Sequence, residues 1–447
     1  MLLEFKAKNY KSFKDELVFT MVPAPKQKGL NYSILNQKIG SKKYKGLSSA
    51  VIYGPNASGK TNIIGAMEAY KSIILRGNIR NADVKNAPNP AGSTLELIPN
   101  SSLTELNPVD FAIKFIENKL LIQYDLSIDI GNFLDAEYPR RILSETLTVN
   151  EEMVFSRKEK LEFGSLKTIK DYLINEFEEN SNSATSLARS NLNQEEMFLT
   201  NGFKAMFSSK LVNLILNWLE NKFMVIYRAD TLHLIQKFAD PRKHTVYIEK
   251  TTNDAAQLFG INSNALGYVV SEDDLEAKLC SIFKNKKAVI AAEMFESYGT
   301  IRFVNMFPLV IKAILTGGTL VVDEFDASLH PMALMSIISI FHNDDINRKN
   351  AQLIFNTHNP IFLNSNLFRR DEIKFVERDD ETHFSKHYSL SDFGTTGEKG
   401  VRLHEDYMHN YFISQYGAIN DIDFTSIFEK LVDENEVLAK VGKDEIE

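Results

Sequence analysis

Apolar and polar residues alternate along the first part of the chain, which is typical of β-strands with one buried face. The first 23 residues predict a pair of strands, and residues 110–116 and 120–130 predict an antiparallel hairpin around the polar turn 117–119. Another run rich in strand-forming residues ends near Phe155. Together these strands predict an antiparallel β layer within residues 1–155.

Helical spacing replaces this alternation from about residue 160. The polar stretch 179–196 predicts a loop. Ser271 with Asp274 fits a capping box and predicts a helix that continues to Lys284. Residues 156–290 are therefore expected to form a mainly helical insertion. Its clearest apolar stripe lies on one helical face and is expected to belong to the core: Leu211, Leu214, Ile215, Trp218 and Leu219.

Strands and helices alternate again in the last part of the chain, residues 291–447. Apolar runs at 319–322, 353–356 and 372–377 predict strands, and a helix is expected to begin at Pro331. Such alternation is typical of a parallel sheet. Because single cores stop growing at about 250–300 residues, a chain of 447 residues is expected to have more than one part. We predict an α/β head whose two halves flank the insertion.

Composition narrows the class of protein. The chain is 44% hydrophobic and 25% charged, as in ordinary globular proteins, and no apolar run approaches the length of a membrane span, so we expect no membrane contact. The single cysteine, Cys280, suits a reducing compartment and favours a cytoplasmic location. A net charge of -8 would repel a polyanion, so any contact with nucleic acid is expected through a local basic patch or a partner.

The strongest motif follows the apolar run at 50–53. The pattern GxxxxGK[ST] is matched by Gly54, Pro55, Asn56, Ala57, Ser58, Gly59, Lys60 and Thr61, and helical spacing begins at Asn62. In this strand, loop and helix context, backbone N–H groups form a cradle for phosphate oxygens. Lys60 would reach the β- and γ-phosphates and the Thr61 hydroxyl would bind Mg²⁺. The motif therefore predicts binding of a nucleoside triphosphate, with Asn62 among the residues at the site.

Three further segments carry candidate chemistry. The apolar run 320–322 ends in Asp323 and Glu324, which suit a magnesium-binding carboxylate and a general base for the attacking water. His358 follows another apolar strand and could hydrogen-bond the γ-phosphate. The turn that contains Ser297 and Gly299 precedes a helix-spaced apolar set, which predicts a second anion site at a helix N-terminus.

In this order the motifs resemble those of ABC-type ATPases of the OLD and abortive-infection group, with SMC and RecF repair ATPases as more distant relatives. The segments that carry the resemblance are 9–13, 54–61, 296–300, 323–331, 357–360 and 411–419. The resemblance implies that Ser297 and Gly299 touch the γ-phosphate held by a second subunit. Tyr298 departs from the family, whose signature has a glycine there. The expected fold class is thus a P-loop ABC-type ATPase head with an antiparallel β layer and a mainly helical insertion.

This resemblance implies a homodimer, or a higher assembly of dimers, that binds ATP and Mg²⁺ at its interface and hydrolyses ATP with Glu324, His358 and Lys60. The expected role is a sensor or scaffold subunit that controls a separate toxic effector, such as a nuclease, in anti-phage defence. A repair-type ATPase that clamps DNA directly, or a scaffold that hydrolyses slowly, are the alternatives. A nuclease site in this chain is disfavoured because Asp421 and Asp423 form only a lone DxD.

Overall fold

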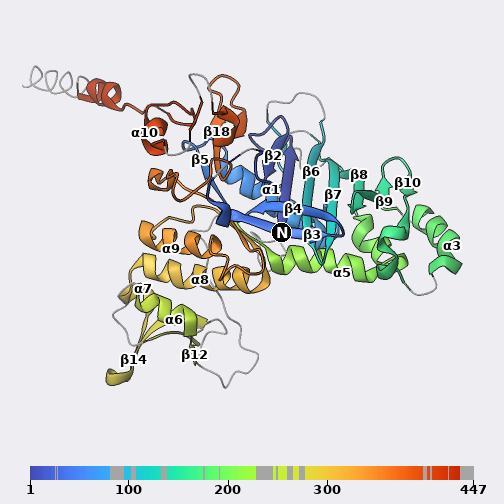
Figure 1. Ribbon diagram of the computed structural model, residues 1–447, viewed down its shortest axis with the longest axis horizontal. Helices are drawn as coiled ribbons and strands as arrows, with labels where there is room; N and C mark the ends of the chain where they lie inside the picture. Colours follow the sequence, from blue (N-terminus) through green and yellow to red (C-terminus); the bar gives the residue numbers. More distant parts are fainter. Residues whose placement is uncertain are drawn as a thin grey trace, which may run out of the picture.

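In the residues that the computed structural model describes, the strands form four sheets (Figure 1). The described residues are 1–25, 27, 29–80, 95–101, 107–131, 138–174, 177–190, 192–227, 245–247, 250–258, 265–270, 277–395, 400–402, 405–420 and 422–432. Asp421, Ser271 and Asp274 lie outside them.

A seven-stranded antiparallel sheet confirms the β layer that the alternating pattern predicted. Phe5 pairs with Phe19 in the first two strands, and Val109 pairs with Ile128 in the predicted hairpin. Buried and half-buried residues alternate along these strands, so one face packs on the core. In spatial order the strands are β10 (Leu161–Phe163), β9 (Glu152–Arg157), β8 (Arg141–Val149), β7 (Leu120–Asp129), β6 (Val109–Glu117), β1 (Leu2–Lys8) and β2 (Leu17–Thr20).

The second large sheet is parallel except at one edge and holds the predicted strands of the last third of the chain. Its middle strands are buried along their whole length, as expected for a sheet covered on both faces. β19 alone runs antiparallel to its neighbour. In spatial order the strands are β11 (Phe223–Ile226), β16 (Thr319–Val322), β17 (Gln352–Asn356), β5 (Ser49–Tyr53), β18 (Ile373–Arg378) and β19 (Ser385–Ser389).

Helices fill the space between the two large sheets and cover the outer face of the parallel one. α1 (Lys60–Arg76) lies between the sheets, where Tyr70 packs edge-on against Phe5 at 5.8 Å between ring centroids. α8 (Tyr298–Thr316) and α9 (Pro331–Phe341) share the second core with the opposite face of the parallel sheet. α8 is long and apolar enough to cross a membrane by length and composition, and 44% of its most apolar window is buried inside the protein.

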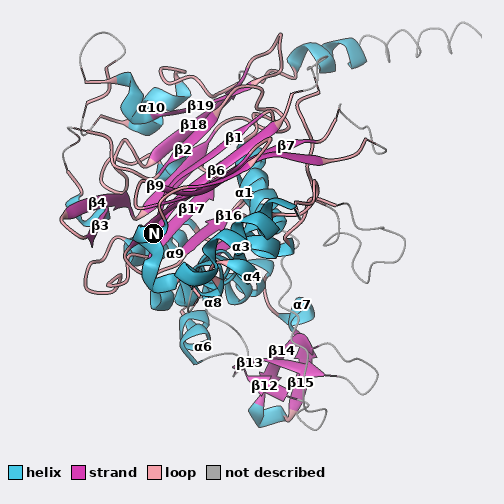
Figure 2. Cartoon of the chain, turned by 90° about the vertical axis from the view of Figure 1, so that its right-hand side faces the viewer, coloured by secondary structure: helices cyan, strands magenta, loops and turns pink. Residues whose placement is uncertain are grey.

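The insertion contains helices and also a small sheet that the sequence did not predict. Four antiparallel strands lie apart from the large sheets (Figure 2): β12 (Thr245–Tyr247), β13 (Ala265–Val270), β14 (Ala277–Phe283) and β15 (Ala288–Ala291). Its helical segments are η3 (Leu166–Tyr172), α3 (Phe177–Ser190), η4 (Leu199–Phe203), α4 (Lys204–Met206), α5 (Ser209–Asn217), η5 (Trp218–Lys222), α6 (Lys250–Gln257) and η7 (Lys284–Lys286).

Two local predictions in the insertion are wrong. The polar stretch expected to be a loop is helical as far as Ser190. The pattern did not predict this helix because its apolar side is narrow: Ala188 is buried and Ala184 packs against the core, among polar neighbours. The residues that were expected to continue a helix to Lys284 are strand β14, since both of its edges pair with neighbouring strands. Tertiary pairing overrides the local helix-capping signal there.

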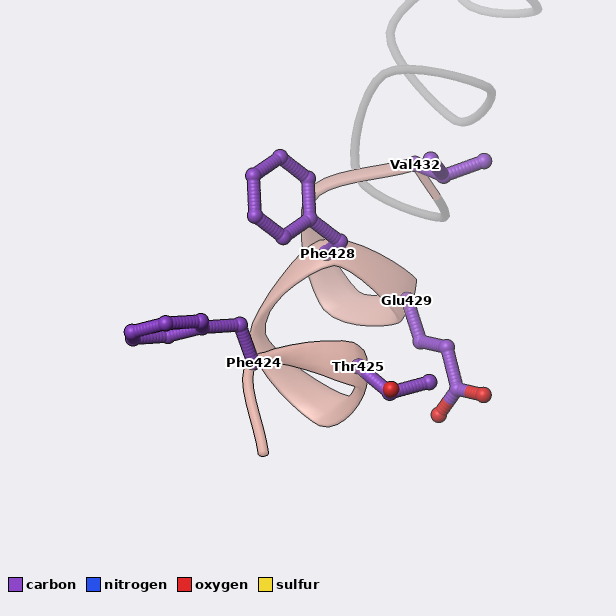
Figure 3. Close-up of a pocket in the computed structure, with 5 residues that line it drawn as sticks. All are labelled: Phe424, Thr425, Phe428, Glu429 and Val432. Carbon is purple, nitrogen blue, oxygen red and sulfur yellow. The ribbon is translucent and has the colours of Figure 1, made fainter. Parts of the chain in front are cut away.

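The remaining elements are short. They are η1 (Asn31–Ser33), the hairpin β3 (Ile34–Ile39) and β4 (Lys42–Leu47), α7 (Ala292–Phe295), η8 (Pro360–Phe362), η9 (Leu390–Phe393) and α10 (Tyr407–Phe412). Residues 425–432 form a further helix that projects from the body (Figure 1), and Figure 3 shows the side chains of Phe424, Phe428 and Val432 on it. These three side chains are more than half exposed.

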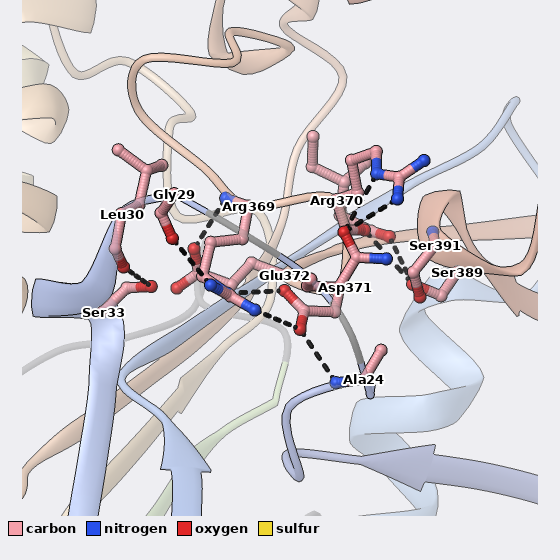
Figure 4. Close-up of polar contacts among 12 residues, drawn as sticks. Ala24, Gly29, Leu30, Ser33, Arg369, Arg370, Asp371, Glu372, Ser389 and Ser391 are labelled. Atoms are coloured by element: carbon pink, nitrogen blue, oxygen red, sulfur yellow. Dashed lines mark hydrogen bonds and ion pairs between the residues drawn. The ribbon is translucent and has the colours of Figure 1, made fainter. Parts of the chain in front are cut away.

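Buried polar contacts hold the start of β18 in place (Figure 4). Arg369 donates two hydrogen bonds to the Asp371 carboxylate, both 2.9 Å, and a third to the carbonyl of Gly29. The same carboxylate accepts the backbone N–H of Ala24. Because each buried charge is paired, the network fixes the segment before β3 against the parallel sheet.

Candidate functional site

The predicted phosphate-binding loop joins β5 to α1. A methyl group on Gly54 would lie 2.2 Å from the carbonyl oxygen of Val376, and one on Gly59 would lie 2.5 Å from the hydroxyl of Ser385. Gly59 also has a φ of 111°, in the region that favours glycine. The glycines therefore allow the loop to pack closely against β18 and β19.

Inside the loop, Lys60 folds back on the backbone. Its Nζ donates hydrogen bonds to the carbonyls of Gly54, at 2.8 Å, and Pro55, at 2.9 Å. Burial lowers the pKa of Lys60 to about 8, although Asp323 and other nearby carboxylates oppose the shift. The Ser58 hydroxyl is buried and has no hydrogen-bond partner in the described part of the protein. A buried ammonium and an unused hydroxyl beside a glycine-rich turn fit an anionic ligand.

Asp323 lies at the centre of the site. The Thr61 hydroxyl donates to its Oδ1 at 3.1 Å, and the Asn356 amide donates to the same atom at 2.5 Å. The side-chain oxygen of Asn356 in turn accepts the backbone N–H of Glu324. These contacts arise because β17 lies between β5 and β16, so that the carboxyl ends of all three strands share one edge.

The Thr61 hydroxyl and the Asp323 carboxylate are oxygen donors of the kind that Mg²⁺ prefers. Their direct hydrogen bond shows that the two side chains reach the same point, where they would hold the ion together. No group of three His, Cys, Asp or Glu that could form a metal cage occurs among the residues that the structure describes. This donor set therefore fits an ion whose remaining ligands are phosphate oxygens and water.

Glu324 and His358 flank this centre. Glu324 has an exposed side chain and a left-handed backbone with a φ of 50°, and its carbonyl accepts a 2.5 Å hydrogen bond from Arg302. His358 is exposed just beyond β17. Desolvation of the ring and then the charge of Lys60 lower the pKa of His358. The catalytic roles of Glu324 and His358 remain predictions.

The Ser297 and Gly299 turn forms the N-terminus of α8. The Ser297 hydroxyl caps the helix by accepting the backbone N–H of Thr300 at 3.1 Å. A methyl group on Gly299 would lie 2.3 Å from the carbonyl oxygen of Ser328, so the turn packs directly on the loop that follows Glu324. Ser297 is exposed, and its hydrogen bonds stay within α8. Within the described residues, no hydrogen bond joins it to Lys60 of the same chain.

Three side chains at the site were not predicted. Asn356 could have been found as the single polar residue at the end of an apolar strand. Ser12 and Ser385 had no clear sequence signal. Ser12 accepts a hydrogen bond from Asn62 at 2.7 Å, the Ser12 and Ser385 hydroxyls lie within hydrogen-bond distance at 2.7 Å, and Ser385 donates to the carbonyl of Ser58. The side chain of Asn62, predicted as a nucleotide ligand, is thus turned to Ser12.

The fold and the site define a P-loop nucleotide-binding protein of the α/β class. A family model described as "AAA domain, putative AbiEii toxin, Type IV TA system" matches residues 49–364 of the chain. The match begins at β5 and includes the loop at 54–61, the Asp323 and Glu324 pair and His358. The chain belongs to this family. The predicted relation to abortive-infection P-loop proteins is thereby confirmed, and the parallel sheet with its antiparallel layer confirms the expected α/β fold class.

Two solved structures are similar to the chain. One is described as the SMC head domain from Thermotoga maritima; it is 13% identical, with coverage of 87% of this chain and 98% of that chain and a TM-score of 0.35. The other is described as SmcHead bound to the C-winged helix domain of ScpA; it is 12% identical, with coverage of 87% and 97% and a TM-score of 0.39. No curated protein matches the chain.

Proposed function

We propose that this protein hydrolyses ATP with Mg²⁺ at an interface between two copies of the chain. We further propose that it acts as a sensor or scaffold subunit that controls a separate toxic effector in anti-phage defence. The observation that carries the ATPase proposal is the hydrogen-bonded set of Thr61, Asp323, Asn356 and Glu324 at the mouth of the phosphate-binding loop.

ATP with Mg²⁺ supplies the activated γ-phosphoryl group when bound. The chain binds the phosphates with the backbone N–H groups of the loop and with Lys60, whose ammonium exchanges the carbonyls of Gly54 and Pro55 for phosphate oxygens. Thr61 and Asp323 would hold the ion. The exposed Glu324 carboxylate would accept the proton of the attacking water as the bond between the γ-phosphorus and the leaving ADP breaks, and the His358 ring could donate an N–H to the γ-phosphate.

In the proposed dimer, the Ser297 and Gly299 turn of one copy completes the nucleotide site at the phosphate-binding loop of the other copy. Ser297 is exposed and Tyr298 beside it is 57% exposed, so this turn is free to meet another molecule. Met294 and Met332 are also exposed, at 82% and 65%. Exposed large apolar side chains favour contact with a protein surface. Loss of the γ-phosphate would weaken such a dimer and make hydrolysis a timer.

The defence role rests on two supports. The description of the family names a toxin and a type IV TA system. In addition, no group of three His, Cys, Asp or Glu that could hold a metal ion occurs in the described part of the chain. Asp423, the one described member of the lone DxD, accepts a hydrogen bond from the backbone of Thr425. The toxic activity is therefore assigned to a separate effector.

The first prediction tests the general base. Glu324→Gln should keep ATP binding and slow steady-state hydrolysis by roughly 10²–10⁴, the usual contribution of a positioned base. It should also accumulate a dimer with ATP, measured by analytical ultracentrifugation with and without nucleotide. Glu381→Gln, which removes an exposed carboxylate from the turn between β18 and β19, is the matched control. Turnover equal to that of the native protein would remove Glu324 from this role.

A further inference from the structure

The helix at residues 425–432, called here the projecting helix, leaves its apolar face exposed. It extends away from the body of the protein (Figure 1). Large apolar residues recur at its start and along it with the i, i+3, i+4, i+7 and i+8 spacing of one helical face. Figure 3 shows two of them, Phe424 and Phe428, on one side of the helix and Glu429 on the other. The whole apolar set is 50–62% exposed: Phe424, Ile427, Phe428, Leu431 and Val432.

The chain is fixed to the body only as far as the residues before this helix. Tyr388 donates a hydrogen bond to the carbonyl of Tyr416, and Tyr411 donates one to the carbonyl of Ala418, both at 2.8 Å. Tyr416 and Ala418 are buried, whereas Ile422 is 62% exposed. Most helical stability in proteins comes from packing of the apolar face. Contact with another molecule would therefore stabilise the projecting helix.

The charge of this end of the chain limits which molecule that can be. Residues 421–447 contain nine acidic and three basic residues, so they carry -6 of the formal net charge of -8. Two copies of this segment would repel each other if their helices paired. Helices that lie on membrane surfaces are rich in Lys and Arg on the polar face, which is the opposite charge. A protein surface rich in Lys and Arg, in contrast, attracts an acidic segment.

We propose that the projecting helix docks in an apolar groove of a partner protein, and that lysine and arginine side chains border this groove. Recognition of a helix in a groove uses apolar anchors at the spacing found here, and the acidic surroundings select a basic rim. A nuclease fits this description, because a protein that holds a polyanion needs a basic surface. Naming the partner as the toxic effector rests on the proposed function, whereas the docking surface itself does not.

The test uses the full chain and two fluorescent amphipathic peptides with the same leucine positions, one of leucine and lysine and one of leucine and glutamate. Fluorescence anisotropy should show binding of the lysine peptide only. Phe428→Ser should weaken this binding by at least about tenfold, as truncation of an interface anchor does. Ser426→Ala, on the opposite side of the same helix, should bind as the native chain does. Urea unfolding of Phe428→Ser should match the native chain, because Phe428 is 62% exposed.

Equal binding of the two peptides, no binding of the lysine peptide, or native affinity in Phe428→Ser would overturn this docking surface. Two further measurements test the other occupants. A dimer that forms without nucleotide and is lost in Phe428→Ser, seen by analytical ultracentrifugation, would assign the helix to a second copy. Flotation with phosphatidylglycerol vesicles that is lost in the same variant would assign it to a membrane. Either result would overturn the proposal.

Lys60→Ala separates the docking surface from the proposed function. This variant should lose ATP binding and keep binding of the lysine peptide, because the projecting helix lies outside the nucleotide site. If the native protein binds no ATP while the lysine peptide still binds selectively, the proposed function fails and the docking surface stands. If ATP is bound and hydrolysed but the lysine peptide is not bound, the docking surface alone fails.

Discussion

The residue with the most constrained environment at the site is Lys60. Its ammonium donates hydrogen bonds to two carbonyl oxygens of its own loop. Burial lowers its pKa to about 8. The protonated form carries the charge that attracts phosphate, and burial opposes that form until phosphate arrives. Bound phosphate would raise the pKa again, so ATP and a proton should bind Lys60 together.

A pH dependence of ATP affinity follows. Because the free site loses the Lys60 proton above about pH 8, the Kd for ATP should be nearly constant below that pH and should rise by up to about tenfold per pH unit above it. Fluorescent-ATP titrations at pH 7, 8 and 9 measure this. Lys60→Ala, with weaker binding, should show no such rise. A flat profile in the native protein would mean that Lys60 does not carry the phosphate contact.

At the scale of elements, the N-terminus of α8 and the loop after β16 form one unit. Gly299 approaches the backbone of Ser328, whose φ of 63° shows that the loop itself turns sharply. The same loop begins at Glu324, whose carbonyl is held by Arg302 from α8. A shift of α8 would therefore move the residue proposed as general base.

Gly299→Ala tests this unit. The added methyl would collide with the Ser328 carbonyl and force the loop or the helix to move, which should destabilise the protein by about 1–3 kcal/mol. ATPase activity should fall while the affinity for ATP at Lys60 stays near the native value. Urea unfolding and ATP titration measure the two effects. Tyr298→Ala, which alters an exposed neighbour, should leave the unfolding free energy unchanged.

The elements also explain which predictions succeeded. Strands β16 and β17 were predictable because they are buried on both faces and have apolar central residues. The positions of Thr61 and Asp323 followed from motifs at strand ends. The insertion was less predictable, since β14 acquires its strand from pairing with β13 and β15. Ser12 could not be assigned because its partner Ser385 is 373 residues away in sequence.

At the scale of the whole molecule, a few side chains connect the two large sheets. Gln352 on β17 accepts the backbone N–H of Leu2 at 2.6 Å and donates to the carbonyls of Leu2 and Leu47. On the other side, His387 of β19 packs against Phe19 of β2, with 5.6 Å between ring centroids. The first strand of the chain is thus held to the parallel sheet, which brings Ser12 to the phosphate-binding loop.

His387 makes this junction sensitive to acid. Its Nε2 is buried without a hydrogen-bond partner in the described protein, and burial lowers its pKa to about 3. The unfolded chain takes up the proton near the ordinary pKa of 6.5, so the unfolded state binds more protons between pH 6.5 and 3. The contribution of His387 to the free energy of unfolding is therefore fully present above pH 6.5 and is lost progressively as the pH falls.

Because the His387 ring binds a proton more readily in the unfolded chain, we expect the free energy of unfolding to fall by up to about 1.4 kcal/mol per pH unit below pH 6. His387→Phe keeps an aromatic ring against Phe19 and removes the titrating group, so it should flatten the profile. Urea unfolding between pH 7 and 5 measures the slopes. His409→Gln, which removes an exposed histidine of α10, should keep the native slope. If His387→Phe also kept it, the acid sensitivity of the junction would have to come from other groups between the two sheets.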